Sequence, residues 1–474
     1  MTLPAKFVER VLRDLGGTEG AALCAALDAE PPVSVRLNPA KTGADTLPAG
    51  PDAGLPVPEA AGLPALAIAG RVPWSRDGRY LAVRPSFTLD PDFHAGAYYV
   101  QEASSQFVGH LLAAVRTEGA RILDLCAAPG GKTTLYASLA GPDGLVVANE
   151  IDRRRASVLA DNVRKWGTGN VAVTTCEPRA LGDFEAWFDV VAVDAPCSGE
   201  GMFRKDPDAR GEWSEGNVKQ CAARQDEILR EAWRALRPGG TLVYSTCTFN
   251  RDEDEGALER MAAWAGDEIA ESEETAVEDA WGIVCGRVGA FRTFRFYPHR
   301  TCGEGFFAAV ARKSFDAGGR VRAPKARRTV FAAVDRKTAG ELARWVRNPG
   351  GMRFAAVADT CYAWYAAQAD AVRTLSEALP VIYSGVALGQ VFKGVLKPDP
   401  ALAFFDGMNR GALPAAELDD EETLRFLRRQ DIAAGGLAEG MNLVCSRGRA
   451  LGFAKRIGAR VNNLYPNSLR IITQ

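Results

Sequence analysis

The sequence predicts an α/β protein with a parallel sheet covered by helices on both faces, an α+β extension before it and a smaller α+β domain after it. Short apolar stretches alternate with amphipathic helical stretches between residues 121 and 246, which is the βαβ rhythm of a parallel sheet. At 474 residues the chain exceeds the usual size of a single domain. A basic segment with glycine and proline, residues 314–328, separates the sheet region from the rest of the chain.

The region before the sheet, residues 1–95, is expected to form a mixed, loop-rich extension. A short helix is expected over 5–15, followed by a strand between prolines over 31–39. A second helix is expected to begin at Tyr98 and to run to about residue 115.

The core, residues 96–313, is expected to hold the sheet. Strands are expected at 121–126, 145–150, 171–175, 188–194 and 241–246, and the main helices at 153–166 and 217–236. A turn at 237–240 is expected to end the last helix. Two more strands, at 291–298 and 305–312, are expected to complete the sheet. Ligands of such a sheet bind at the carboxyl ends of its strands.

The last region, residues 329–474, is expected to be separate and rich in strands, near 381–396 and again from 441 onward. The basic run that precedes it, 312–328, carries seven lysines and arginines against the single acid Asp316. Two interpretations of this run stay open, a solvated linker or a contact with phosphates.

Composition excludes several functional classes. The chain is 47% hydrophobic and 24% charged, and it has neither an apolar run long enough to cross a membrane nor a signal-peptide core. Its ten cysteines form no Cys-x-x-Cys pair, so reduced thiols and a cytoplasmic location are expected. With only three histidines, neither a metal site nor a histidine-based triad is expected. The net charge of −2 neither requires nor excludes a nucleic-acid partner.

A glycine-rich turn at 124–134 joins the first core strand to a helix. Its end copies a phosphate-binding loop, but Cys126 stands where that motif needs its first glycine, and Pro129 interrupts the N–H donors. Glu150 ends the next strand, where a ribose is expected to bind. These residues favour a nucleoside cofactor without a triphosphate, S-adenosyl-L-methionine. A turn that only packs strand on helix is the alternative.

Two cysteines follow neighbouring core strands, Cys197 in Asp-Ala-Pro-Cys-Ser-Gly and Cys247 in Tyr-Ser-Thr-Cys-Thr. This pairing suits methylation of carbon 5 of cytosine. A carboxylic acid such as Asp194 can share a proton with N3 of the base, and a thiolate then adds to carbon 6. A small buried hydrophobe is the commoner fate of one cysteine, but two at successive strand ends favour chemistry.

These motifs resemble those of the Sun/nucleolar-protein family of RNA (cytosine-5) methyltransferases. Further segments resemble the bacterial members that modify small-subunit ribosomal RNA, and the ending resembles their C-terminal PUA-like RNA-binding domain. The segments that carry this closer resemblance are 85–90, 94–105, 203–207, 452–458 and 463–466.

The resemblance implies a class I, Rossmann-like methyltransferase sheet and a role for each motif. Cys247 would attack carbon 6, Cys197 would assist product release, and Lys205 would lie near the reacting base. On the residues alone the two thiol roles stay open, because DNA cytosine methyltransferases attack with the Pro-Cys thiol. The cofactor pocket would be lined by Cys126, Ala127, Ala128, Pro129, Gly130, Gly131, Lys132, Glu150, Glu177 and Asp194.

One segment departs from the family pattern. Where the family shows Asp-Gly-Arg after the third strand, this chain has Cys-Glu-Pro-Arg at 176–179. Glu177 can still accept a hydrogen bond from the adenine amino group, while Pro178 changes the local backbone.

The expected protein is a monomeric methyltransferase of 16S ribosomal RNA without a metal. Residues 1–95 would be an RNA-binding extension, 96–313 the S-adenosylmethionine-dependent core, 314–328 a basic linker and 329–474 a PUA-like RNA-binding region. Arg36 and Asn38 would either contact RNA or belong to a buried strand. Alternatives are the same chemistry on tRNA or 23S rRNA, a P-loop-like NTPase and a non-catalytic RNA-binding assembly factor.

Overall fold

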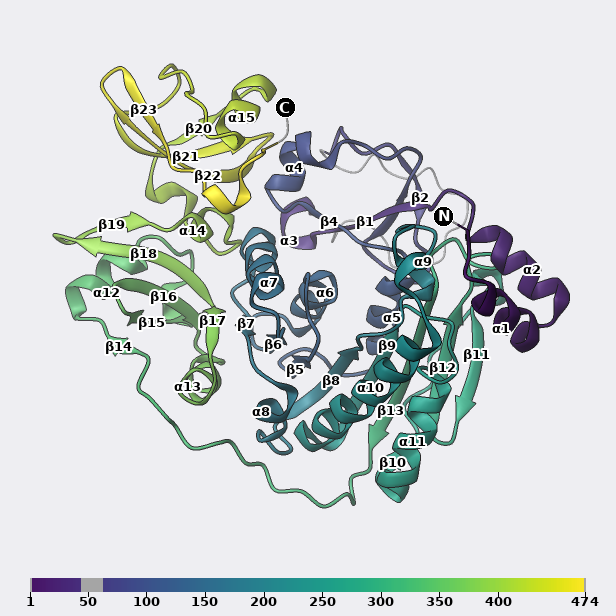
Figure 1. The fold of residues 1–474 in the computed structure, drawn as a ribbon. Helices are drawn as coiled ribbons and strands as arrows, with labels where there is room; N and C mark the ends of the chain where they lie inside the picture. Colours follow the sequence, from purple (N-terminus) through teal and green to yellow (C-terminus); the bar gives the residue numbers. More distant parts are fainter. Residues whose placement is uncertain (1, 44–62, 473–474) are drawn as a thin grey trace.

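A mixed sheet forms the centre of the computed structural model, which describes residues 2–43 and 63–472 (Figure 1). Within these residues its ten strands run in the order β11-β12-β13-β9-β8-β5-β6-β7-β17, with β10 paired to β13. The five middle strands are parallel: β5 (Arg121–Asp124), β6 (Leu145–Asn149), β7 (Val171–Thr174), β8 (Phe188–Asp194) and β9 (Leu236–Thr246). The predicted α/β fold class is confirmed.

Antiparallel strands complete the sheet at both edges. Beside β9 lie β13 (Phe306–Lys313), β12 (Phe291–Phe296) and β11 (Val284–Val288), with β10 (Ile269–Ala270) alongside, so the two predicted later strands are confirmed. Beyond β7 lies β17 (Val381–Ser384). This strand belongs to the segment expected in the last region, yet it extends the core sheet.

Alternating residues of the parallel strands face opposite layers of helices. Ile122 and Val146 pack among residues of α5 (Phe107–Ala113), α6 (Gly131–Ala140) and α7 (Arg153–Trp166). Leu123 and Val147 pack on the other face. The helices on that face are α8 (Pro178–Gly182), α10 (Glu215–Ala235) and α11 (Glu255–Ala265). The period of two along each strand therefore produces the two-faced core.

The turn predicted at 237–240 is instead a bulge inside β9. Helix α10 ends at Ala235, as expected, but the chain pairs with β8 at once through Leu236 and resumes regular pairing at Thr241. The Arg237 guanidinium contacts the Asp189 carboxylate at 2.6 Å. The turn-forming residues are thus accommodated by a shift of register rather than by an interruption of the strand.

The N-terminal extension combines helices with a small antiparallel sheet of order β2-β3-β1-β4. Its elements are α1 (Ala5–Leu15), α2 (Gly17–Ala26), β1 (Val33–Leu37), α3 (Pro39–Thr42), β2 (Ile68–Arg71), β3 (Gly78–Leu81), α4 (Pro91–His94) and β4 (Tyr98–Val100). The helix predicted from Tyr98 is wrong at its start. Aromatic and β-branched residues at 98–100 pair with β1 instead, and α5 begins only at Phe107.

Arg36 of β1 is buried and joins the extension to the core. Its guanidinium donates to Gln101 Oε1 at 2.7 Å, to Thr134 Oγ1 at 2.6 Å and to the Gly131 carbonyl at 3.1 Å. Burial lowers its pKa to about 10. Asn38 is buried as well, with its amide donating to backbone carbonyls. Of the two interpretations of this pair, the buried strand is correct.

Two further sheets follow the core. The first contains β14 (Ala332–Ala333), β15 (Met352–Val357), β16 (Thr360–Tyr365), β18 (Val386–Phe392) and β19 (Val395–Pro398), with α12 (Arg336–Ala343), α13 (Ala369–Ala378) and α14 (Pro400–Phe404) nearby. The second contains β20 (Ala415–Glu417), β21 (Gly440–Ser446), β22 (Arg449–Ile457) and β23 (Arg460–Asn463), with α15 (Asp420–Leu427). In Figure 1 the second sheet, in yellow, lies next to α4 of the extension.

Charged side chains link this last sheet to the extension. Arg447 contacts Asp92 at 3.0 Å and Asp90 at 3.4 Å, and Arg449 contacts Asp92 at 2.8 Å. The segment 314–328 crosses to the last region without helix or strand. Among the described residues, no helix combines the length and apolar character needed to span a membrane.

We expect Arg36→Ala to lower the free energy of unfolding by about 3 kcal/mol. The substitution removes three buried hydrogen bonds and leaves Gln101 and Thr134 oxygens without their donor. Thermal unfolding would show a lower midpoint than wild type. Arg154→Ala, at an exposed arginine, is the matched control and is expected to change stability by about 0.5 kcal/mol at most. Equal midpoints for the two variants would contradict the anchoring role of Arg36.

Candidate active site

The turn after β5 brings backbone close to its neighbours. Gly130 has φ +112°, a conformation that favours glycine, and a Cβ there would lie 3.0 Å from Leu159 Cδ1. A Cβ added at Gly131 would lie 3.2 Å from the ring of Tyr99. Helix α6 begins at Gly131, so its free N–H groups point out of this turn. The two glycines thus shape a narrow approach to the helix start.

A cavity of about 150 Å³ lies at this turn. It brings together most of the predicted cofactor residues, namely Cys126, Ala127, Ala128, Pro129, Gly131, Lys132 and Asp194. The other side is formed by Tyr99, Val100, Gln101, Glu102 and Ser105 from β4 and the turn after it, together with Asp124. Strand β4, which pairs with β1 of the extension, therefore helps to form one wall of the cavity.

Asp124 is a buried carboxyl group at this cavity. Thr133 Oγ1 donates to its Oδ2 at 2.6 Å, while its Oδ1 has no hydrogen-bond partner among the described residues. Burial raises the pKa of this group from 3.8 to about 7. An unpartnered buried oxygen is costly for the fold, so this position suits a donor supplied by a ligand.

Asp194, at the end of β8, is held by two neighbours. Lys132 Nζ lies 2.8 Å from its Oδ2, and Ser245 Oγ donates to its Oδ1 at 2.8 Å. Burial alone would lower the pKa of Lys132, but the charge of Asp194 and the hydrogen bond outweigh it, so the net shift is upward. Lys132 is therefore a cation at this site, and it fixes the orientation of the Asp194 carboxylate.

The two cysteines lie in direct contact. Strands β8 and β9 are parallel neighbours in which Asp194 pairs with Ser245, so the loops that follow them leave the sheet side by side. Cys197 Sγ lies 3.2 Å from Cys247 Sγ. The hydrogen bond to Cys247 and burial raise the pKa of the Cys197 thiol well above its usual value. Cys197 therefore holds its proton more firmly than an ordinary cysteine does.

A buried acid, Glu200, ties these loops to the first helix of the chain. Arg10 of α1 and Trp213 Nε1 both donate to its Oε1, the latter at 2.8 Å. The backbone N–H of Phe249 donates to its Oε2 at 3.3 Å. Next in the chain, Gly201 N–H donates to the Cys247 carbonyl at 2.9 Å. The segments that follow Cys197 and Cys247 in the chain are thus joined by buried hydrogen bonds.

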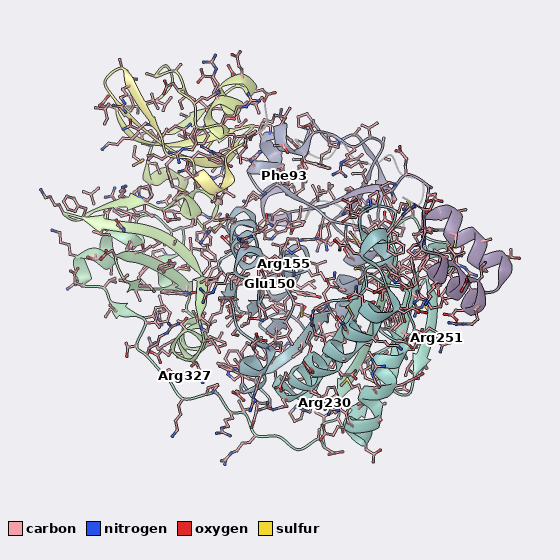
Figure 2. All side chains as sticks on the ribbon, in the orientation of Figure 1. Phe93, Glu150, Arg155, Arg230, Arg251 and Arg327 are labelled. Carbon is pink, nitrogen blue, oxygen red and sulfur yellow. The ribbon has the colours of Figure 1, made fainter. Side chains whose placement is uncertain are left out.

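Glu150 follows β6 and is almost fully buried. Its carboxylate contacts Arg155 at 3.2 Å and accepts the backbone N–H of Asp152 at 3.1 Å. Figure 2 shows Glu150 and Arg155 together near the middle of the molecule. Arg155 also donates to the Ala128 carbonyl at 3.0 Å, which connects Glu150 to the glycine turn.

Six predicted site residues are not among those that line the cavity: Gly130, Glu150, Cys197 and Cys247, described above, and Glu177 and Lys205, which are exposed. Glu177 is exposed and precedes α8, where Pro178 occupies the first helical position, a place that suits proline. Lys205 is exposed in the turn after Met202. Neither side chain contributes to the cavity at the glycine turn, so their assigned roles stay predictions.

Sequence reasoning missed several residues of the site. Tyr99 and Gln101 line the cavity because 98–100 form a strand of the extension, which the predicted helix hid. From the sequence, Asp124 is interpreted only as the start of the glycine turn. The pattern that could have identified it as a site residue is that Asp124 ends β5 while Asp194 ends the neighbouring strand β8. Glu253 and Gln225, which hold the Cys197 loop, gave no local signal in the sequence.

Three family models match the chain. Residues 3–103 match the N-terminal domain of 16S rRNA methyltransferase RsmF, 111–312 match 16S rRNA methyltransferase RsmB/F, and 414–471 match the methyltransferase RsmF PUA domain. Among the described residues, no cluster of three or more histidine, cysteine or acidic side chains has the arrangement of a metal site.

Curated relatives and solved structures agree with this match. "Ribosomal RNA small subunit methyltransferase F" of Shewanella loihica is 31% identical over 84% of this chain and 83% of its own length. The protein of the same name from Escherichia coli strain SE11 is 32% identical over 84% of both chains. A methyltransferase homolog from Pyrococcus horikoshii is 27% identical, with a TM-score of 0.51 over 65% of this chain and 94% of that chain. PH0851 is 26% identical, with a TM-score of 0.56 over 66% of each chain.

We expect Asp124→Asn to stabilise the protein above pH 7 and to leave it nearly unchanged near pH 4. The folded state raises the pKa of Asp124 from 3.8 to about 7, so its protonated form is favoured there. The corresponding stability is present below pH 4 and is lost as pH rises through 7, by up to about 4 kcal/mol. Asparagine stays neutral and can still accept from Thr133. Thermal midpoints across pH 4–8 measure this, and parallel curves for the two proteins would refute it.

Proposed function

We propose, from the premise that this chain belongs to the RsmB/F family of 16S rRNA methyltransferases, that it methylates carbon 5 of a cytosine in small-subunit ribosomal RNA. The family makes it an S-adenosylmethionine-dependent rRNA methyltransferase. The base, the carbon and a covalent route through Cys247 are the proposal. The observation that supports them is the contact between the Cys197 and Cys247 thiols at 3.2 Å. The two cysteines follow shortly after Asp194 and Ser245, which pair with each other near the ends of β8 and β9.

The cavity at the glycine turn fits S-adenosyl-L-methionine. Because the turn contains glycines, a ligand can approach its backbone closely. The unpartnered Asp124 Oδ1 can accept a hydrogen bond from a cationic amine of the ligand. We assign Cys126–Lys132 to the wall around the cofactor and Glu150 to its ribose hydroxyls, with Glu177 on the adenine amino group. When bound, the cofactor supplies a methyl group on a positively charged sulfur.

Asp194 is assigned to the cytosine ring. Lys132 and Ser245 fix both of its carboxyl oxygens, so its orientation is set before a base arrives. A proton that Asp194 takes up from water as the base binds, and then shares with N3, withdraws electrons from carbon 6 and prepares it for addition. Lys205, which is exposed and follows Asp194 in the chain, is assigned to the phosphate or base beside the target cytosine.

Cys247 is assigned to attack carbon 6, and the raised pKa of the Cys197 thiol supports this choice. The raised pKa of Cys197 makes it a poor source of thiolate, so the attack is assigned to Cys247. Addition of Cys247 makes carbon 5 a nucleophile. After methylation, a base must remove the proton on carbon 5 so that the bond to Cys247 breaks. Cys197, in contact with the departing sulfur, is assigned to this release: its thiol gives its proton to the Cys247 sulfur as that bond breaks, and the resulting Cys197 thiolate takes up the proton from carbon 5.

The remaining domains are assigned to RNA. A cytosine must leave its stack to reach the half-buried thiols, so flanking modules have to hold the surrounding strand. We assign this role to the extension 1–95, the basic segment 314–328 and the region 329–474 with its PUA domain. We propose that the protein acts as a monomer in the cytoplasm.

A gel assay for covalent protein–RNA adducts tests this function. We expect Cys197→Ala to accumulate a stable adduct with 16S rRNA in the presence of S-adenosylmethionine, because addition proceeds and release fails. We expect Cys247→Ala to form no adduct and to transfer no methyl group. Methyl incorporation at carbon 5, read by nucleoside analysis, accompanies the gel.

Cys24→Ala, a cysteine of the extension away from the thiol pair, is the matched control and should behave as wild type. An adduct with Cys247→Ala but not with Cys197→Ala would exchange the two roles. No adduct in any lane together with no methyl incorporation would refute the proposal and favour a non-catalytic RNA binder. Incorporation into tRNA or 23S rRNA alone would refute the proposed substrate.

A further inference from the structure

Two buried side chains hold the backbone on both sides of Cys197. Gln225 of α10 donates its Nε2 to the Pro196 carbonyl at 3.0 Å. Glu253, in the turn between β9 and α11, accepts the Ser198 N–H through its Oε2 at 2.9 Å. The same Gln225 Nε2 donates to Glu253 Oε2 at 3.0 Å. The residues before and after Cys197 are thus joined through one amide and one carboxylate, which we call the Cys197 clamp.

The clamp lies entirely within the protein. Gln225 and Glu253 are each 0% exposed. The amide oxygen Oε1 of Gln225 and the second carboxyl oxygen Oε1 of Glu253 have no hydrogen-bond partner among the described residues. Burying a carboxylate and an amide with unsatisfied oxygens lowers the stability of the fold. Burial also raises the pKa of Glu253 to about 7. These costs point to a role beyond packing.

The turn that carries Glu253 is itself firmly held. Tyr244 OH donates to the Glu253 carbonyl at 2.6 Å. The next residue, Asp254, accepts from Thr246 Oγ1 at 2.6 Å and from Arg295 at 2.8 Å. Glu253 therefore has little freedom to follow a moving Cys197 loop, and the loop is fixed relative to β9.

The clamp acts on Cys197 more directly than on Cys247. Its contacts reach Pro196 and Ser198, the chain neighbours of Cys197. The Cys247 carbonyl is held separately, by the Gly201 N–H at 2.9 Å. A further bridge between the two loops runs from Ser198 Oγ to Thr248 Oγ1 at 3.0 Å. Loss of the clamp would thus displace Cys197 while leaving the Cys247 backbone contact in place.

We propose that Glu253 and Gln225 are positioning residues for product release, which hold the Cys197 thiol against Cys247 through the backbone on both sides of it. This inference rests on the proposed function, in which Cys197 assists release. Neither side chain touches the base or the cofactor in this scheme. Hydrogen-bond acceptance by Glu253, rather than its charge, does the positioning.

The test compares Glu253→Ala, Gln225→Ala and Glu253→Gln with wild type and Cys197→Ala, all as full-length protein with 16S rRNA. For both alanine variants we expect multiple-turnover methylation to fall about tenfold, the size of one lost buried hydrogen bond. Single-turnover methyl transfer should stay near wild type, and the covalent adduct should accumulate. A merely structural defect would lower single-turnover transfer as well. Glu253→Gln keeps an acceptor oxygen and should restore release.

Exposed residues on α10 and α11 provide controls. Gln220→Ala on α10 and Glu259→Ala on α11 should turn over as wild type without adduct. Thermal midpoints identify any variant that fails to fold, in which case Glu253→Gln and Gln225→Ala still decide the outcome. Wild-type turnover by both alanine variants would overturn the clamp, as would a Glu253→Gln variant as defective as Glu253→Ala. If no variant forms an adduct and no methyl group is incorporated, the proposed function fails instead.

Discussion

The parallel pairing of β8 with β9 is the constraint on which the rest of the site depends. Asp194 and Ser245 are partners in that pairing, and the chain leaves both strands at the same edge of the sheet. Cys197 follows three residues after Asp194, and Cys247 follows two after Ser245. The contact between the sulfurs is therefore set by strand register. A shift of register between these strands would separate the thiols and also remove the Ser245 hydroxyl from Asp194.

Buried polar side chains then convert this register into a defined geometry. Lys132 reaches Asp194 from the start of α6, and Arg10 reaches Glu200 from the first helix of the chain. Arg36 joins the extension to the glycine turn in the same manner. Each is a cation taken from water and used to connect segments far apart in the sequence. The extension is consequently part of the construction of the site and not a module merely attached to it.

The sequence was informative wherever structure depends on neighbours along the chain. The alternation of strands and helices, the glycine turn and the two cysteine motifs are local patterns, and the structure brings them together as expected. Contacts between segments that are distant in the sequence could not be predicted from it. The pattern around Tyr98 predicts a helix, whereas these residues pair with β1. No local pattern near 381–384 predicts that these residues pair with β7. Glu253 and Gln225 lie 55 and 29 residues from their partners Ser198 and Pro196.

Strand β17 has a consequence for how the chain is made. It covers the edge of β7, yet it follows β7 in the sequence by the whole second half of the core and the basic segment. Until Ser384 has been synthesised, β7 presents a row of unpaired backbone groups to the cell. At about 5–20 residues per second, that interval lasts on the order of ten seconds or more. During this time the catalytic core exists as a nascent chain with an open sheet edge, and its completion depends on a segment that contributes nothing to the chemistry.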